Sequence, residues 1–257
     1  MKKVRAKKKL GQHFLKDLSV SQKIAQTLPQ DQTLNVLEIG PGMGMLTQFL
    51  IQQSHPLKVV EIDSESVAYL QAHYPFLTQD IVQEDILKLD FQKLYGTNEF
   101  AVIGNFPYNI SSQIVFKVLS ARTQIPFFAG MFQKEVAQRL CEPPGSKQYG
   151  ILSVLVQLFY ETSYLFEVPP EAFNPPPKVH SAVIQCQRKD NFSLDCDEAF
   201  LFQIVKLSFQ QRRKTLRNSL KTLAIPENIR EDSIFDLRPE KLSGASFVEL
   251  TKRISDG

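Results

Sequence analysis

The chain has 257 residues, of which 43% are apolar and 22% are charged, enough for one large core or two unequal cores. Eleven glycines and 15 prolines exclude a collagen-like or low-complexity chain, and the longest apolar run, Ile125 to Phe132, is far shorter than the roughly 18 residues of a membrane-spanning helix. Three cysteines without a CxxC pair and four scattered histidines support neither a disulfide framework nor a metal site. We therefore expect a globular protein that holds no metal.

Positive charge gathers near both ends of the chain, although the net charge is only +3. Residues 2–9 contain six lysines or arginines and no acidic residue, and residues 212–221 contain five and none. No continuous apolar segment follows the first cluster, so we expect a cytoplasmic protein that is neither secreted nor exported. Dense positive charge of this kind is typical of contact with nucleic-acid phosphates.

Short β-rich runs alternate with longer amphipathic stretches between residues 34 and 184, which predicts an α/β fold with a mostly parallel sheet. A proline-rich connection at residues 169–177 is too short for a crossover helix, so the two strands that it joins should pair antiparallel. The predicted strands are residues 34–39, 57–62, 100–103, 125–132, 164–168 and 179–185.

The β pattern stops after Lys189, and the remaining residues read as helices interrupted by Pro226 and Pro239. We therefore expect two domains. The first is a sheet domain with a basic N-terminal arm at residues 1–189, and the second is a small helical domain at residues 190–257.

A glycine loop follows the first predicted strand. Gly40, Gly42 and Gly44 lie between this strand and a helix expected at residues 46–53, a context typical of a nucleotide site because glycines let a ligand approach the backbone closely. A dinucleotide fingerprint would have its third glycine at position 45, where the chain has Met45, so a pyrophosphate ligand is disfavoured. A tight strand-to-helix turn is the alternative explanation of the loop.

Acidic residues end the next two strand-like segments. Glu61 lies about 20 residues after the loop, where a carboxylate can accept both hydroxyls of a ribose. Asp63 could instead cap the following helix, and Asp85 is placed either to accept a hydrogen bond from an adenine amine or to cap a turn. Taken together, the loop and these acids indicate an adenosine-containing cofactor without pyrophosphate, which fits S-adenosylmethionine.

The four residues Asn105, Phe106, Pro107 and Tyr108 follow the fourth predicted strand. An adenine amine is a poor nucleophile, so an enzyme that methylates it must orient the amine toward the methyl group. The Asn105 amide oxygen and a carbonyl of the rigid Phe106-Pro107 peptide can each accept an amine proton, and Tyr108 offers a face on which the base can stack. We expect solvent water to take the proton. A polar loop with a half-buried tyrosine is the alternative.

This motif looks like the Asn-x-Pro-Tyr motif of adenine-amine methyltransferases, and Glu38 to Gly44 looks like their cofactor loop. Residues 9–15, 173–183 and 209–216 are similar to three signatures of the ribosomal RNA adenine dimethylases. The match is best to the KsgA type, which dimethylates two adjacent adenosines near the 3′ end of small-subunit (16S) ribosomal RNA. The resemblance implies a Rossmann-like methyltransferase fold with seven strands, an antiparallel terminal hairpin and an all-α C-terminal domain.

The resemblance also implies roles for individual residues. It implies that Phe173 faces Tyr108 across a flipped-out target base. Two positions depart from the usual family pattern, since His13 stands where Asn is typical and His180 stands where Asp is usual. The implied cofactor contacts, together with the glycine loop, are His13, Leu15, Gly40, Gly42, Glu61, Asp85 and Asn105.

Ribosomal RNA in an immature small subunit is the expected partner, because the target adenosines must leave any base stack before they can react. Nothing in the sequence indicates a dimer, so we expect a monomer. The arm could also be a solvated tail, and the C-terminal cluster could form ion pairs within its own domain. The candidate RNA-binding residues are Lys7, Lys8, Lys9, Arg212, Arg213, Lys214 and Arg217.

Three other functions compete with this interpretation. The first is methylation of large-subunit ribosomal RNA, as in the related antibiotic-resistance methylases. The second is a ribosome-assembly role in which binding to the subunit is separable from methylation. The third is a nicotinamide oxidoreductase, which Met45 in the glycine loop disfavours.

Overall fold

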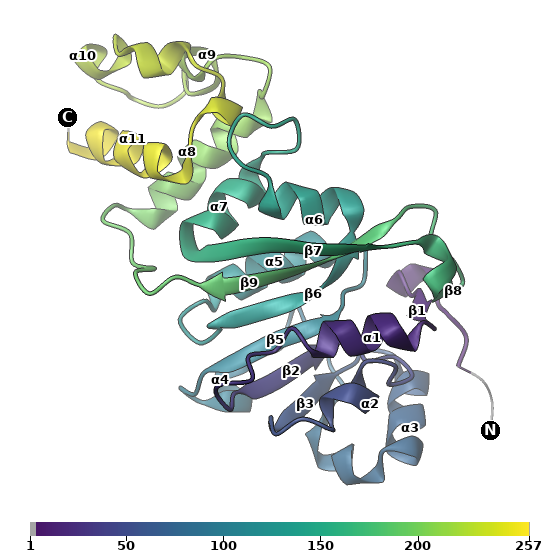
Figure 1. Cartoon of the computed structure of the whole chain (residues 1–257). Helices are drawn as coiled ribbons and strands as arrows, with labels where there is room; N and C mark the ends of the chain where they lie inside the picture. The colour runs from purple at the N-terminus through teal and green to yellow at the C-terminus, as the bar shows by residue number, and fades with distance from the viewer. Residues whose placement is uncertain (1–3, 257) are drawn as a thin grey trace. The chain divides into compact units, whose positions relative to one another are not determined.

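The computed structural model describes residues 4–256, so Lys2 and Lys3 of the basic arm lie outside the described residues (Figure 1). Contacts between residues divide the chain into two units. The first contains the residues up to Ala137 together with Ser163–Arg188, and the second contains Gln138–Thr162 together with the residues from Lys189 onward. The second unit thus includes a segment from the middle of the chain.

A seven-stranded sheet forms the centre of the first unit (Figure 1). Its strands, in spatial order, are β4 (Ile81–Val82), β3 (Leu57–Val60), β2 (Asn35–Ile39), β5 (Phe100–Asn105), β6 (Phe127–Gln133), β9 (Ser181–Arg188) and β7 (Tyr160–Val168). The pairs from β4 to β6 are parallel, and β9 pairs antiparallel to β6. The predicted fold class, a mostly parallel seven-stranded sheet with an antiparallel end, is confirmed.

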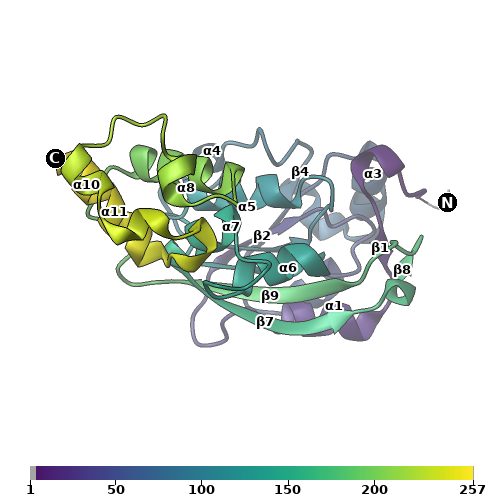
Figure 2. The same ribbon diagram turned by 90° about the horizontal axis from the view of Figure 1, so that it is seen from above.

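Helices cover both faces of this sheet, with α1 and α5 on opposite sides in both views (Figures 1 and 2). Three of the helices begin at an aspartate whose side chain accepts backbone N–H bonds, which satisfies donors that a helix end leaves open. The helices are α1 (Leu18–Ala25), α2 (Thr47–Leu50), α3 (Ser64–His73), α4 (Phe91–Tyr95), α5 (Ser111–Ser120) and α6 (Lys134–Cys141), with 3-10 turns at Lys8–Leu10, Pro75–Asp80 and Pro170–Ala172.

A second, two-stranded sheet joins segments far apart in the chain. β1 (Phe14–Leu15) pairs antiparallel with β8 (Phe173–Asn174), and the Lys16 N–H donates to the Ala172 carbonyl at 2.8 Å. These short strands were not predicted, because two residues carry no readable period. Their pairing ties the N-terminal segment to the proline-rich connection.

Strands β5 and β6 approach each other closely where Gly104 pairs with Gly130. A Cβ added to Gly130 would lie 2.2 Å from the Gly104 carbonyl oxygen and 2.7 Å from the Phe106 ring, and the Gly130 φ angle is 153°. Only glycine fits this position. Because the strands lie so close, the Phe106 ring packs against β6 at Gly130 and Phe132. This contact fixes the position of the residues that follow β5.

The second unit is helical. Its core includes the buried side chains of Ile204, Phe235 and Phe247. No helix within residues 4–256, in either unit, is long and apolar enough to cross a membrane. The helices are α7 (Ile151–Phe159), α8 (Glu198–Gln210), α9 (Leu216–Ser219), α10 (Glu227–Arg230) and α11 (Gly244–Asp256), with 3-10 turns at Ser233–Asp236 and Pro239–Lys241.

The Gly130→Ala variant should be less stable by at least about 2 kcal/mol, because a methyl group forced into a packed core displaces the neighbouring strand. Urea unfolding followed by circular dichroism measures the loss. Gly145→Ala is the control, since Gly145 also has a positive φ, 93°, but no atom lies within 4 Å of the added Cβ. Equal losses in the two variants would contradict the steric explanation.

Candidate active site

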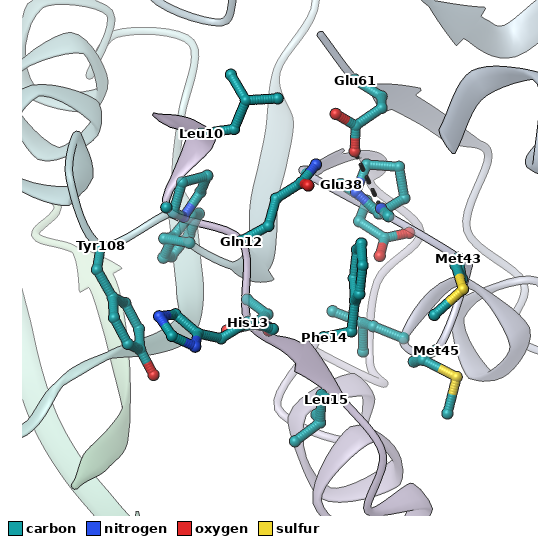
Figure 3. A pocket seen from close by; sticks show the side chains of 18 of the residues that line it. Leu10, Gln12, His13, Phe14, Leu15, Glu38, Met43, Met45, Glu61 and Tyr108 are labelled. Carbon is teal, nitrogen blue, oxygen red and sulfur yellow. Dashed lines mark hydrogen bonds between the residues drawn. The ribbon is translucent and has the colours of Figure 1, made fainter. Parts of the chain in front are cut away.

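A pocket with an empty volume of about 710 Å³ opens in the first unit, at the ends of β2, β3 and β5 (Figure 3). Four separate segments line it: the N-terminal residues 10–15, the end of β2 with the glycine loop, Glu61 with Ile62 after β3, and the motif after β5. Figure 3 shows Glu38 and Glu61 at one side of the pocket and Tyr108 with His13 at the other. Its lining includes the sequence-predicted residues His13, Leu15, Gly40, Gly42, Glu61, Asn105, Phe106, Pro107 and Tyr108.

Glu61 follows β3 directly and is only 5% exposed. One carboxylate oxygen accepts the Gly42 N–H at 3.1 Å, and the other accepts the Asp63 N–H at 2.9 Å. Burial raises the pKa of Glu61, while these N–H bonds act in the opposite direction. A carboxylate offers about four acceptor positions, so Glu61 can still receive the two hydroxyls of a ribose.

Gly42 lies against the N-terminal segment. A Cβ at this position would lie 3.0 Å from the Phe14 ring, and the φ angle of Gly42 is 56°, which a side chain disfavours. The loop can therefore approach both Glu61 and β1 only because residue 42 has no side chain.

Glu38 is a second buried carboxyl in the pocket wall, and the sequence interpretation gave it no individual role. It lies on β2, is 1% exposed and accepts a hydrogen bond from the Thr47 hydroxyl at 2.7 Å. Burial raises the pKa of Glu38 to about 8, and the nearby Glu61 adds to the shift. The sequence did contain a signal for Glu38, because it is an acidic residue within the otherwise apolar run of β2.

The N-terminal segment is fastened over the pocket by polar contacts. Lys7 forms ion pairs with Asp63 and with Glu65, the latter at 3.0 Å, and the Gln12 amide donates to Asp63 at 3.3 Å. Asp63 also caps α3, which is the alternative role considered for it. Burial acts to raise the pKa of Asp63, but the bonds from Lys7 and Gln12 outweigh it and hold the pKa below its usual range.

The motif after β5 is held by main-chain bonds. The Asn105 amide nitrogen donates to the His13 carbonyl at 3.2 Å, and the Phe106 N–H donates to the Met131 carbonyl at 3.1 Å. The Pro107 carbonyl accepts the Ile110 N–H at 3.2 Å. Within residues 4–256 the Phe106 carbonyl accepts no hydrogen bond. The oxygen of the Phe106-Pro107 peptide is therefore available to accept one from a ligand.

Tyr108 is half-buried at the far side of the pocket. Its hydroxyl hydrogen-bonds to the Ser181 hydroxyl on β9, and its ring stacks on His13 with 5.4 Å between centroids and 26° between planes. Burial raises the pKa of Tyr108, and the Ser181 bond only partly offsets this shift. Tyr108 is therefore a neutral, fixed aromatic surface.

Two predicted site residues lie outside the pocket lining. The Asp85 carboxylate accepts the Leu87 N–H at 2.9 Å, which is the turn-capping alternative, and Phe173 is 1% exposed in the core. A contact of Phe173 with the target base stays a prediction that requires its ring to leave the core. His180 is exposed, and its carbonyl accepts the Lys134 N–H.

The candidate RNA-binding residues divide by their intramolecular contacts. Lys7 is paired with Asp63, and Arg217 donates to Asp236 at 2.8 and 2.9 Å and to the Arg230 carbonyl at 2.6 Å. One Arg212 nitrogen donates to the Ser146 carbonyl at 3.1 Å. Lys8 and Lys9 lie in the first 3-10 turn, and Arg213 and Lys214 line a hollow that follows α8.

Comparison with known proteins decides the family. The family model described as ribosomal RNA adenine dimethylase matches residues 3–255. The chain belongs to this family. The family uses S-adenosylmethionine, so the predicted cofactor and the predicted methyltransferase activity are confirmed.

Curated relatives extend over the whole chain. A protein of Flavobacterium johnsoniae named ribosomal RNA small subunit methyltransferase A is 58% identical, over 100% of this chain and 99% of the relative. One of the same name from Parabacteroides distasonis is 56% identical, over 98% and 94%. Both similarities extend over nearly the whole of the two sequences compared.

Two solved structures share the fold at 24% sequence identity. A dimethyladenosine transferase from Plasmodium falciparum has a TM-score of 0.78 over 95% of this chain and 98% of its own. The 23S rRNA methyltransferase ErmE has a TM-score of 0.69 over 93% and 99%.

The pocket fits the cofactor of this family. A buried carboxylate with spare acceptor positions suits the ribose, and the glycine loop leaves backbone space for the amino-acid portion. Within residues 4–256, no cluster of three or more His, Cys, Asp or Glu side chains could hold a metal ion.

The stability of the cofactor-free protein should depend on the ionisation of Glu38. Its folded pKa, about 8, lies above the unfolded value, so the free energy of unfolding falls as the pH rises from about 5 to 8, by up to about 1.4 kcal/mol per pH unit. Glu38→Gln cannot ionise and should show a smaller fall. Urea titrations at several pH values test this, and parallel pH curves for the two proteins would contradict it.

Proposed function

We propose that this enzyme dimethylates the exocyclic amines of two adjacent adenosines near the 3′ end of 16S ribosomal RNA during assembly of the small subunit. One observation carries the proposal. The residues suited to hold the cofactor and the motif suited to orient an adenine amine line a single pocket. The names of the full-length relatives support the small subunit as the substrate.

On the cofactor side, Glu61 would accept the ribose hydroxyls while Gly42 and Asp63 hold its carboxylate in place. Glu38 would meet the positively charged amino group of the cofactor, which would stabilise its ionised form. Asp85 lies outside the pocket lining, and it would accept from the adenine amine through the carboxylate oxygen that does not bond the Leu87 N–H. S-adenosylmethionine supplies a sulfonium methyl group that needs no further activation.

On the substrate side, Asn105 and Phe106 would present two acceptors to the amine. Because the Asn105 nitrogen is engaged by the His13 carbonyl, its amide oxygen is the atom left for the substrate. The Phe106 carbonyl would accept the second amine proton, since the Pro107 carbonyl already receives the Ile110 N–H. Two acceptors on the amine hydrogens direct its lone pair toward the methyl group.

The second unit would provide contacts to the RNA backbone. Arg213 and Lys214 are the best candidates, because they line a hollow after α8. Arg217 is a weaker candidate, because it forms an ion pair with Asp236. We also propose that residues 190–257 form an RNA- or subunit-binding domain, and that the enzyme acts as a cytoplasmic monomer on an immature subunit. Its binding could contribute to assembly separately from methylation.

Large-subunit methylation is the competing function. The similarity to ErmE extends to the fold alone at 24% identity, whereas the relatives named for the small subunit are above 50% identical. The decisive experiment transfers labelled methyl groups from S-adenosylmethionine to small subunits that lack the modification, with large-subunit RNA in parallel. Dimethyladenosine confined to the small subunit supports the proposal, and label on large-subunit RNA alone overturns it.

Asn105→Ala should lower kcat by about 100-fold or more, because the amine loses an oriented acceptor. Binding to the small subunit should persist, since phosphate contacts supply most of the affinity. Asn35→Ala is the matched control, as Asn35 lies outside the pocket lining and donates only to the Glu99 carbonyl. Single-turnover methyl transfer checks the prediction, and equal rates in both variants would contradict it.

Replacing Arg213 and Lys214 together by serine should weaken RNA binding and reduce its salt dependence, with the logarithmic slope changing by up to about 0.9 for each lost phosphate contact. Filter binding over a series of salt concentrations measures the slope. Lys88 and Lys93 replaced by serine make the same charge change at exposed positions of the first unit. An equal change of slope in that control would indicate a general charge effect.

A further inference from the structure

His13 contacts two segments that lie far from it in the chain. Its carbonyl accepts the Asn105 amide N–H, its ring stacks on Tyr108, and its Nδ1 lies 2.9 Å from the Pro175 carbonyl oxygen. These contacts bring the N-terminal segment, the motif after β5 and the proline-rich connection together at one residue. Figure 3 shows the His13 ring beside Tyr108, away from Glu38 and Glu61.

The hydrogen bond to Pro175 determines how the imidazole is held. A carbonyl oxygen can only accept, so Nδ1 carries the proton and donates it. The ring is thereby oriented by one bond at its edge while its face lies against Tyr108. The family resemblance places Asn at this position, and Asn has no ring that could stack.

The His13 and Tyr108 rings lie farther apart than a tight stack but too close together to hold a base between them. His73 and Tyr69 on α3 stack with centroids 3.8 Å apart, whereas His13 and Tyr108 are 5.4 Å apart. A base held between two parallel rings needs about 7 Å, which is two stacking steps of about 3.4 Å. The Tyr108 hydroxyl is bonded to Ser181 and the His13 ring to the Pro175 carbonyl. For a base to enter, the His13 side chain would give up its bond to Pro175 and move, while Tyr108 stays in place.

The place opposite Tyr108 is therefore held by His13. Phe173 is buried in the core, with its backbone paired to Leu15 in the small two-stranded sheet. The His13 carbonyl can keep its bond to Asn105 while the ring rotates about the side-chain bonds, so opening the stack does not disturb the acceptor geometry at the motif.

We propose that the His13 ring is a wall of the target-base pocket: it covers a face of Tyr108 in the free enzyme and stacks on the opposite face of the adenine once the base has entered. This inference rests on the proposed role of Tyr108 as a base-stacking residue. It makes the His13 ring a substrate-side group, in addition to the cofactor contact that the family resemblance implies for this residue.

Two substitutions separate the ring from the hydrogen bond. His13→Phe keeps an aromatic ring but cannot donate to Pro175, and His13→Asn keeps a donor but has no ring. Each is made in the full-length enzyme and bound to small subunits whose 16S RNA carries 2-aminopurine at a target position. This base lacks the amine that accepts the methyl group, so binding is observed without turnover, and stacking quenches its fluorescence.

The wild-type enzyme and His13→Phe should quench the probe, and His13→Asn should leave it brighter. With the normal substrate, kcat/KM of His13→Asn should fall by about tenfold, within the range measured for loss of one base-stacking ring. Its affinity for S-adenosylmethionine, measured by calorimetry, should be unchanged. His73→Ala removes a His–Tyr stack outside the pocket lining and should match the wild type in every measurement.

Equal quenching by the wild type and His13→Asn would overturn the inference. So would loss of quenching in His13→Phe alone, which would assign the effect to the Pro175 hydrogen bond. Failure of the proposed function is distinguishable from both results, because it shows as a wild-type enzyme that transfers no methyl group to the small subunit.

Discussion

The hydrogen bond between the Asn105 amide and the His13 carbonyl is the contact on which the pocket depends. It joins residues 92 positions apart and connects the end of β5 to the segment that covers the cofactor side. The donation commits the Asn105 nitrogen to the protein and leaves its amide oxygen without this partner. A single amide thereby joins two walls of the pocket, and in the proposed function its oxygen is the acceptor for the amine.

Two buried carboxyl groups shape the cofactor side. Glu61 is bonded by backbone N–H groups of the glycine loop, and Glu38 by one hydroxyl. In the free protein burial raises the pKa of both carboxyl groups, so ionising either one costs free energy. A cationic ligand in the pocket would offset this cost, which agrees with the proposed binding of a sulfonium cofactor beside these groups.

Close backbone packing places the catalytic motif. The Gly104–Gly130 pair lets β5 and β6 approach, and the buried Phe106 ring packs against Phe132 with 4.7 Å between centroids. Because the Phe106 ring is anchored in the core, its carbonyl is fixed relative to Asn105. The Phe106 side chain is therefore structural, and the proposed role of this residue toward the substrate uses its peptide oxygen instead.

The sequence by itself determined the sheet, the glycine loop and the Asn105–Tyr108 motif, because strand periodicity and short local signatures depend on neighbouring residues. It also indicated Glu61, since the end of the strand after the loop is a defined position. Only the tertiary structure decided that Lys7 pairs with Asp63, that Phe173 lies in the core and that His13 stacks on Tyr108. These contacts join positions separated by many residues, and no local pattern in the chain encodes which distant side chain will occupy the space beside another.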